Sequence, residues 1–394
     1  MKAIGIVGGG FSGTMTAVWL MKNSTEKLQI YLIEKDHLAR GQAYADIDPH
    51  LLLNVRADQM GAFPDDIGHF YRWLQDKKIE CSASDFISRK IYGDYLSELL
   101  AKAIKESAGR VLVEIIKDQV IDLDAENKKL VFETHTPIQV DEVVLAIGLK
   151  LPAEFNFTEI KAGPGPITII GTGLSMVDVV VYLHSIGHQG KITAVSRRGR
   201  APLAHQFYDA TVARPVYDFT KTHSLRDVLS MVRGNLKRFE WRLVIDGLRP
   251  HTQLLWSGWN LKERSQFLRY LRPIWDIHRH RISSQHQKIL NDLKSIGRLE
   301  IKAIGFGNFQ PETQIVMKCH GLTQNKSDFV KKLIEKKLVT ADCFQLGIES
   351  QTNWIHTIGP LKRGQLWESL AVPEIRKQAH ELANHLVPKL VVVL

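Results

Sequence analysis

Cysteine is scarce in this 394-residue chain. The three cysteines, Cys81, Cys319 and Cys343, lie far apart and form no CxxC pair. The sequence therefore predicts neither a disulfide framework nor a cysteine-based metal or redox site. A reducing, cytoplasmic compartment is expected.

Long apolar runs are missing as well. No window approaches the roughly 18 consecutive apolar residues of a membrane-spanning helix. The first ten residues break into glycines where a signal peptide would carry a small-residue cleavage site. Low-complexity tracts and repeats of solenoid length are also lacking. We therefore expect a soluble globular protein with no membrane partner.

The charge that the chain does carry is mostly positive and unevenly spread. Hydrophobic residues make up 44% and charged residues 24%, ordinary values for a globular protein, and the length predicts two or three domains or one domain with large insertions. The net charge is +10, and residues 236–282 alone carry ten Lys/Arg against four Asp/Glu. Such a region can bind nucleic acid, membrane headgroups or phosphate-bearing small molecules.

The chain opens on a strand–helix–strand pattern. Lys2–Val7 predicts a buried strand, Ser12–Lys22 a helix and Gln29–Glu34 a second strand. Helices are also expected at 67–77 and 92–107, within a first domain that spans residues 1–162.

A glycine-rich turn joins the first strand to the first helix. Its glycines, Gly8, Gly10 and Gly13, have the spacing that permits a tight turn, a close approach of pyrophosphate and close helix–strand packing. Glu34 closes the second strand, where an acid can bind ribose hydroxyls. The pattern predicts a dinucleotide site.

The middle of the chain changes pattern. Residues Arg110–Gly148 alternate in polarity, turn at 124–127 and predict an antiparallel meander followed by a buried strand that ends in glycine. Gly163–Pro166 is the clearest linker.

A second strand–helix–strand unit follows the linker. It comprises Thr168–Ile170, Ser175–Ile186 and Lys191–Ser196, with Gly171 and Gly173 in its turn. Met176 stands where a third glycine or an alanine is expected. The pattern predicts a second dinucleotide site, in which the Met176 side chain either separates helix and strand or crowds the pyrophosphate.

The order of these segments is that of flavoproteins with two dinucleotide domains. We therefore predict an α/β fold with two dinucleotide-binding (Rossmann-like) domains of the two-domain flavoprotein type. An FAD-binding domain would occupy 1–162 and return at 323–394, and an NAD(P)-binding domain would occupy 163–322. The second domain would contain a helical insertion at about 215–295. Strands are expected at 299–304 and 313–318, helices at 326–337 and 373–386, and an irregular stretch between these two helices.

Several stretches support a closer resemblance. They are GGGFSG, GQAY (41–44), LLNVRADQMG (52–61), IYGDYL (91–96), SRRG (196–199), LRPIWDIHRHR (271–281) and IGPLKRGQLWESLAVPEIRKQA (358–379). In these the chain resembles the bacterial FAD/NAD(P)-binding proteins that include L-aspartate N-monooxygenase-like flavoproteins. The similarity runs along nearly the full length.

The resemblance implies FAD as a cofactor and suggests where it binds. It also implies that the N-terminus of the last helix faces the flavin. The residues expected to bind FAD are Gly8, Gly10, Phe11, Ser12, Gly13, Glu34, Lys35, Gln42, Tyr44, Asn54, Met60, Val120, Ala146, Gly148, Gly359, Gly364 and Leu366.

The nicotinamide site is assigned to Gly171, Gly173 and Ser175, with Arg197 and Arg198 after the following strand. Guanidinium groups in this position suit a 2′-phosphate, whereas an NAD site would usually show an acid there. NADPH is therefore favoured, with NADH as the alternative.

The basic helical region allows more than one interpretation. His278 and His280 are two residues apart, so a helix would point their rings away from each other, and no metal is predicted. Arginines interleaved with Trp241, Trp256 and Trp259 could bind nucleic acid. Because these tryptophans, like Trp275, lie among apolar residues, we favour a packed insertion that caps the active site and whose arginines bind an anionic small-molecule substrate.

The preferred function is an FAD-dependent oxidoreductase reduced by NAD(P)H, monooxygenase-like, acting on a small amine or amino acid. No catalytic residue is assigned, because a bound flavin would carry the chemistry. The alternatives are a nucleic-acid-binding or RNA-modifying flavoprotein and a flavin-binding protein without turnover. The sequence does not indicate the oligomeric state.

Overall fold

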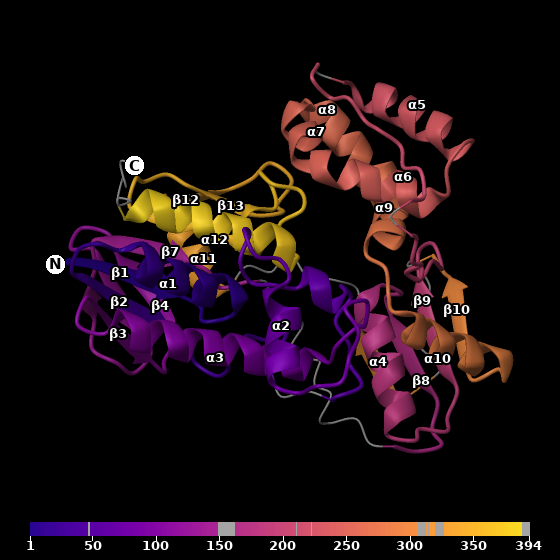
Figure 1. Ribbon diagram of the computed structural model, residues 1–394, viewed down its shortest axis with the longest axis horizontal. Helices are drawn as coiled ribbons and strands as arrows, with labels where there is room; N and C mark the ends of the chain where they lie inside the picture. Colours follow the sequence, from indigo (N-terminus) through magenta and orange to yellow (C-terminus); the bar gives the residue numbers. More distant parts are fainter. Residues whose placement is uncertain are drawn as a thin grey trace. The chain divides into compact units, whose positions relative to one another are not determined.

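The computed structural model describes residues 1–45, 48–148, 162–209, 211–221, 223–305, 313, 315–319 and 327–387. The chain forms two compact units (Figure 1). The first unit comprises Met1–Pro49, Val55–Lys150 and Gln324–Leu394, and the second comprises His50–Asn54 and Leu151–Thr323. The predicted domain boundary between 322 and 323 lies outside the described residues.

A parallel sheet of five strands forms the centre of the first unit. Its order is β14 (Ile355–Thr357), β7 (Glu142–Leu145), β1 (Lys2–Val7), β2 (Leu28–Ile33) and β3 (Val111–Ile116). Neighbouring strands are all parallel. Strand β1 lies in the middle and is apolar because both of its faces are covered.

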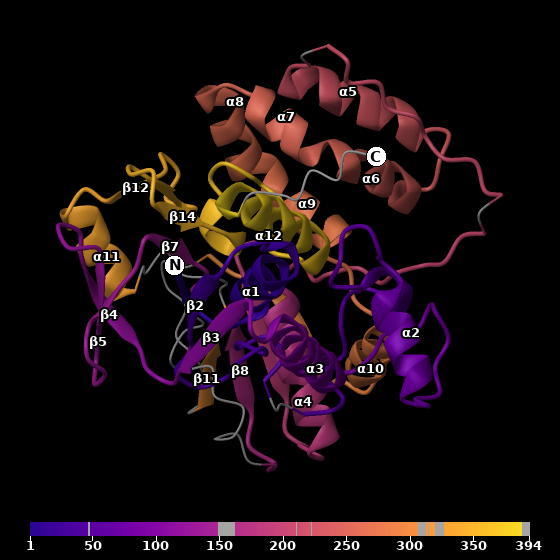
Figure 2. The ribbon, with the colours of Figure 1, turned by 60° about the vertical axis from the view of Figure 1, so that its left-hand side comes forward.

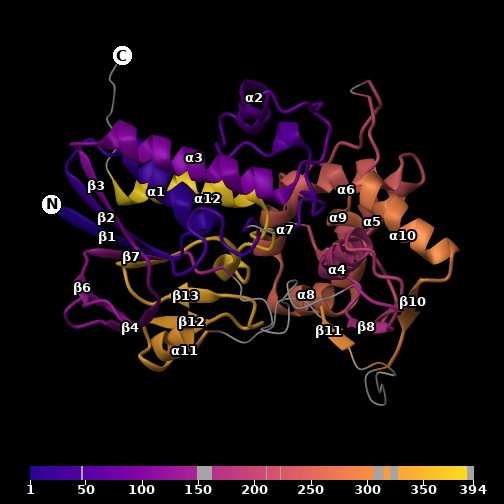
Figure 3. The same ribbon diagram turned by 90° about the horizontal axis from the view of Figure 1, so that it is seen from below.

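Layers on either side cover this sheet. Helix α1 (Phe11–Asn23) packs against α3 (Arg89–Ser107) and α12 (Val372–Leu386), and the three form one layer (Figure 3). The antiparallel meander of β4 (Val120–Asp124), β5 (Lys129–Phe132) and β6 (Ile138–Gln139) shares its core with α11 (Asp328–Glu335). Figure 2 shows α11 beside β4 and β5.

Two predictions about the first unit are wrong. The segment 111–116 was expected to open the meander, but it is β3, which pairs in parallel with β2 at the edge of the sheet. Because β3 is an edge strand, its side chains are only partly covered: Leu112 and Ile115 are 53% and 45% exposed. The stretch expected to be irregular contains β12 (Val339–Ala341), β13 (Ile348–Ser350) and β14, which at three residues each are too short to show a period.

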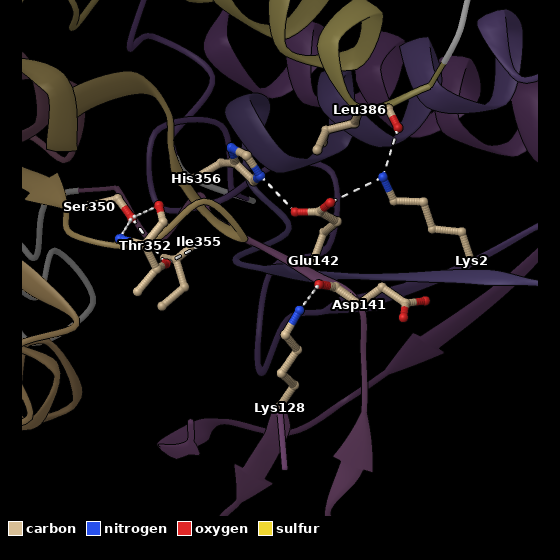
Figure 4. Close-up of polar contacts among 9 residues, drawn as sticks. All are labelled: Lys2, Lys128, Asp141, Glu142, Ser350, Thr352, Ile355, His356 and Leu386. Carbon is tan, nitrogen blue, oxygen red and sulfur yellow. Dashed lines mark hydrogen bonds and ion pairs between the residues drawn. The ribbon is translucent and has the colours of Figure 1, made fainter. Parts of the chain in front are cut away.

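A polar network ties the ends of the first unit together (Figure 4). Glu142, which opens β7, pairs with Lys2 of β1 at 3.1 Å and with Nε2 of His356 in β14 at 2.9 Å. Nζ of Lys2 also donates to the carbonyl of Leu386, the last residue of α12. The first strand, two later strands and the last helix therefore meet at the amino-terminal edge of the sheet.

A parallel sheet of four strands forms the second unit. Its order is β10 (Leu299–Ala303), β9 (Ile192–Ser196), β8 (Ile167–Ile170) and β11 (Ile315–Lys318). All neighbours pair in parallel. Helix α4 (Leu174–Ser185) connects β8 to β9, and α10 (Ser284–Ser295) precedes β10.

A helical segment intervenes between β9 and α10. Figure 1 shows α5, α6, α7 and α8 gathered in one group, with α9 leading back towards β9 and β10. The bounds of these helices are α5 (Leu225–Leu236), α6 (Trp241–Leu248), α7 (Thr252–Gly258), α8 (Leu261–Gln266), a π-helical turn (Phe267–Leu271) and α9 (Arg272–Arg279).

Tryptophans form much of the core of this helical segment. Trp256 is 1% exposed and its ring packs edge-on against Phe267. Trp259 is also buried, and its Nε1 donates to the carbonyl of His223. Trp241 lies at its surface, between the guanidinium of Arg242 and the ring of His278. Two of the four tryptophans thus hold the helices together.

Candidate dinucleotide sites

The first glycine-rich turn is held tightly against the sheet. Gly8 has φ +104°, and a Cβ atom there would lie 2.5 Å from the carbonyl oxygen of Ala146 at the end of β7. A Cβ atom at Gly13 would overlap the carbonyl oxygen of Gly8. The turn therefore requires glycine at both positions, for the reason that the sequence spacing predicts.

The N-terminus of α1 lacks the side-chain cap that several other described helices have. Its N-cap is Gly10, no side chain bonds to its first amides, and its first turn contains no acid. By contrast, α3, α5, α10 and α11 begin with Ser88, Ser224, Ser283 and Ser327, whose hydroxyls accept from backbone amides. An uncapped helix N-terminus suits an anionic group such as a pyrophosphate.

Glu34 lies beside the turn, as its place after β2 predicts. One carboxylate oxygen accepts from the amide of Gly9 at 2.8 Å, and the other accepts from the amide of Asp36 at 3.3 Å. The carboxylate thus joins the glycine-rich turn to the next loop. Lys35 points elsewhere: it is exposed and pairs with Glu133 at 2.7 Å, which raises the pKa of its ammonium group.

The loop with Gln42 and Tyr44 also reaches the turn. The backbone of Gly41 approaches that of Gly10, and a Cβ atom at Gly41 would lie 3.0 Å from the Gly10 Cα. Burial raises the pKa of the Tyr44 hydroxyl to about 12, so Tyr44 stays neutral at physiological pH. The side chain of Gln42 is exposed.

Tyr92 brings three predicted FAD residues together. Its fully buried ring lies 4.8 Å from that of Tyr44 and 6.4 Å from that of Phe11. Its hydroxyl donates to the carbonyl of Met60 at 2.9 Å. Although Tyr92 lies in the IYGDYL stretch, it was not predicted as a site residue, because a buried tyrosine in a helix gives no separate signal in the sequence.

The tail of the chain contributes to the same region. Gly359 begins a short 3₁₀ turn beside Ser12 of α1, and its amide donates to Oε1 of Gln378 in α12 at 3.0 Å. Nη1 of the buried Arg376 donates to the carbonyls of Gln59 and Gly61 at 3.2 and 2.7 Å. Gln378 and Arg376 were missed, because sequence alone does not show which face of a helix is turned inward.

Gly364 and Leu366, which were also predicted to bind FAD, contact other residues of the tail. Gly364 packs against the Asp342 side chain, and the amide of Leu366 donates to the carbonyl of Lys362 at 2.7 Å. The first turn of α12 contains Glu374, an acid that would oppose an anionic group at this helix N-terminus, which was expected to face the flavin.

Three further residues were predicted to bind FAD: Val120, Gly148 and Asn54. Val120 begins β4 with its side chain in the core, and Gly148 follows β7 and Ala146. Asn54 belongs to the second unit, where its carbonyl accepts from Nε2 of His205 at 3.0 Å.

The second glycine-rich turn repeats the features of the first. Gly171 has φ +116°, and Gly173 is an N-cap without a side-chain bond, again with no acid in the first helical turn. Ser175 lies in that first turn. Met176 is 0% exposed and packs inside the unit, so the helix accommodates its side chain without a third glycine. The Met176 side chain therefore lies in the core of this unit.

The two predicted arginines follow β9. Arg197 and Arg198 are exposed, and Nη2 of Arg198 donates to the carbonyl of Arg269 at 3.1 Å. The turn beneath them is held by Ser196, whose hydroxyl accepts from the Gly199 amide at 3.0 Å and bonds to Thr172 at 2.9 Å. Two guanidinium groups are therefore presented at the edge of the second sheet.

Neither a metal cluster nor a membrane helix is found in the part of the chain that the structure describes. Its His, Cys, Asp and Glu side chains form no group of three that could hold a metal ion. Its helices are also too short or too polar to cross a membrane. The ring of His278 bonds instead to the carbonyl of Ile274 at 2.7 Å.

Comparisons with known proteins agree with this architecture. Residues 5–150 match the model of the FAD-NAD(P)-binding family. No curated protein matches the chain in sequence. Among solved structures, L-lysine 6-monooxygenase from Pseudomonas syringae is similar, with 15% identity, coverage of 98% of both chains and a TM-score of 0.60.

Two further structures cover 98% of both chains. The reduced form of ornithine hydroxylase from Pseudomonas aeruginosa has 13% identity and a TM-score of 0.57, and bacillithiol disulfide reductase from Staphylococcus aureus has 12% identity and a TM-score of 0.56. At these identities the similarity establishes the fold. The predicted α/β class with two dinucleotide-binding domains is confirmed.

Proposed function

We propose that the protein is an FAD-dependent oxidoreductase reduced by NAD(P)H, with a monooxygenase-like reaction on a small amine or amino acid. The observation that carries this proposal is a pair of helices, α1 and α4, one in each unit. Each follows a buried parallel strand through a glycine-rich turn and begins at a glycine without a side-chain cap. Two such turns suit two dinucleotides. The family match over 5–150 and the fold shared with two amino-acid hydroxylases support it.

The residues of the first unit fit FAD. The glycine-rich turn and the amides of Phe11 and Ser12 would hold the pyrophosphate, Glu34 would bind the ribose, and Tyr44, Met60 and Gly359 would line the isoalloxazine side. A bound flavin accepts a hydride from a nicotinamide and passes the electrons to dioxygen or another acceptor. The protein's part is to orient the two cofactors and exclude water.

NADPH is the proposed reductant. Arg197 and Arg198 end the strand at which NADP-binding domains recognise the 2′-phosphate, and the described residues at this position include no acid that would bind a free ribose hydroxyl. The substrate is proposed to be a small, anionic molecule such as an acidic amino acid, in keeping with the basic helical segment. An activity like that of L-aspartate N-monooxygenase and a cytoplasmic location are parts of this proposal.

Disulfide reduction is a weaker candidate, although one structure of similar fold has that activity. Cys319 is the only cysteine that follows a strand of the second sheet, and burial raises the pKa of its thiol to about 12. A thiol with that pKa is a poor source of thiolate at neutral pH. Nucleic-acid binding is also disfavoured, because the buried Trp256 and Trp259 cannot stack on bases.

The test is a visible absorbance spectrum of the purified protein followed by anaerobic addition of NADPH or NADH. We expect a yellow protein that NADPH bleaches, and that re-oxidises in air with oxygenation of an added amino acid. A yellow protein that neither nicotinamide bleaches would contradict the reductive step and support flavin binding without turnover. A colourless protein that takes up no added FAD would overturn the proposal entirely.

A further inference from the structure

One helix carbonyl near the second site has lost its usual donor. In an α-helix the carbonyl of Arg269 would accept from the amide four residues later, which is position 273. That residue is Pro273, which has no N–H. The helix widens here into the π-helical turn Phe267–Leu271, in which the amide of Arg272 reaches back five residues to Phe267.

The carbonyl finds its partner outside the helix. It accepts from Nη2 of Arg198, at 3.1 Å, from the loop that follows β9. A guanidinium has five N–H groups in one plane, and this bond restrains the group while using only one of them, which leaves other N–H groups available to a ligand. The bond therefore positions one of the two arginines proposed to recognise the 2′-phosphate.

The same bond brings the backbone of a further arginine, Arg269, to this loop. Arg269 is exposed, and its guanidinium lies 5.3 Å from the ring of Tyr270, which is 54% exposed. The two segments that this bond joins contain no acid. Residues 179–208, which include Arg198, and residues 264–275, which include Arg269, have no Asp or Glu. The carboxylate of Glu300, on the neighbouring strand β10, forms ion pairs with Lys191 and Lys302. The juxtaposed segments thus present positive charge.

We propose that the helical insertion completes the nucleotide site: Arg198 and Arg269 together bind the 2′-phosphate of NADPH, and Pro273 positions Arg198 by freeing the Arg269 carbonyl. The ligand class is a 2′-phosphorylated adenine nucleotide. This inference rests on the proposed function, because it specifies the reductant of the same enzyme. It also gives a role to the proline of the LRPIWDIHRHR stretch.

The test measures binding apart from turnover. The full-length protein is titrated by calorimetry with adenosine 2′,5′-bisphosphate and with ADP, which lacks the 2′-phosphate. We expect the unaltered protein to prefer the bisphosphate. Arg269→Ala and Pro273→Ala should each weaken bisphosphate binding by about tenfold, the effect of one lost charge-assisted hydrogen bond, and leave ADP binding unchanged. Arg233→Ala, an exposed arginine of α5, is the control and should change neither.

The possible results separate this inference from the proposed function. Arg269→Ala and Pro273→Ala proteins that bind the bisphosphate like the unaltered protein, while Arg198→Ala does not, would overturn the role of the insertion. Equal affinity for the two nucleotides would overturn the 2′-phosphate site and leave flavin reduction by NADH open to its own test. Loss of both the preference and flavin bleaching would defeat both proposals. Circular dichroism of each variant confirms that it is folded.

Discussion

The Cα of Gly13 packs so closely against the carbonyl oxygen of Gly8 that a Cβ atom at Gly13 would overlap it. The first turn of α1 therefore lies on the end of β1 with no room for a side chain. This contact also fixes the direction of the free amides at the helix N-terminus.

Gly13→Ala should abolish flavin binding. The added methyl group meets backbone, which cannot rotate away, so the turn must shift and its amides lose their alignment. Flavin content is measured from the absorbance of the purified variant, with added FAD. Gly109→Ala is the control. Gly109 has φ +82°, so an alanine there strains the backbone, but an added Cβ atom would meet nothing within 4 Å. The variant should therefore be less stable and still bind FAD. A Gly13→Ala protein with full flavin content would contradict the expectation.

Met176→Ala should destabilise the protein and spare FAD. The Met176 side chain is fully buried, and removing a buried methionine side chain typically costs about 2–5 kcal/mol. The free energy of unfolding is measured in urea, and flavin content is measured alongside. If the variant is as stable as the parent chain, Met176 does not fill the core of the second unit. Stronger NADPH binding by the variant would instead show that the side chain crowds the nucleotide.

Tyr92→Phe should lower stability by about 1–3 kcal/mol, because the buried carbonyl of Met60 loses its donor. The change should also alter the flavin spectrum, since Met60 and Tyr44 both contact Tyr92. Thermal unfolding and the visible spectrum are the measurements. Tyr270→Phe, at an exposed tyrosine of the second unit, should change neither. An unchanged flavin spectrum in Tyr92→Phe would separate Tyr92 from the FAD site.

Asp118 should make stability depend on pH in the acid range. Burial by itself raises the pKa of its carboxyl, but hydrogen bonds from the amides of Gln119, His135 and Thr134 and from the Thr134 hydroxyl outweigh burial and lower it to about 2. A carboxyl with a lowered folded-state pKa contributes stability above its unfolded-state pKa, near 4, and loses it as the pH falls towards 2.

The measurement is the melting temperature between pH 6 and pH 2 for Asp118→Asn beside the parent chain. The variant should be less stable at pH 6, and its stability should fall less steeply below pH 4. Asp76→Asn, at an exposed carboxylate that ends helix α2 (His69–Asp76), should leave the parent profile unchanged. Parallel curves for the parent and the Asp118 variant would show that this carboxyl is not responsible.

Much of the fold could be predicted because its signals are local. The two strand–turn–helix units appear where the glycines place them, and their strands are apolar because both faces are covered. The prediction failed at β3 and at β12 to β14. A local pattern does not distinguish a partly exposed edge strand of a parallel sheet from a strand of an antiparallel meander, and a strand of three residues has no measurable period.

The candidate site could be predicted only in part. The glycine turns and Glu34 are found from spacing, and their assignment as ligands remains a prediction. Tyr92, Arg376 and Gln378 were missed, since each acts through a backbone group far away in the chain. Two residues that were predicted to bind FAD make other contacts. Lys35 pairs with Glu133, and the Val120 side chain lies in the core.

The sequence by itself determined the two dinucleotide turns, because glycine spacing after a strand is a local requirement of backbone geometry. It also determined that Pro273 has no amide to donate. Only the tertiary structure decided what replaces that donor, because the partner, Arg198, is 71 residues from Arg269 along the chain. The burial of Met176 and the meeting of Glu142, Lys2 and His356 were decided in the same way: such contacts depend on packing between segments that no local pattern specifies.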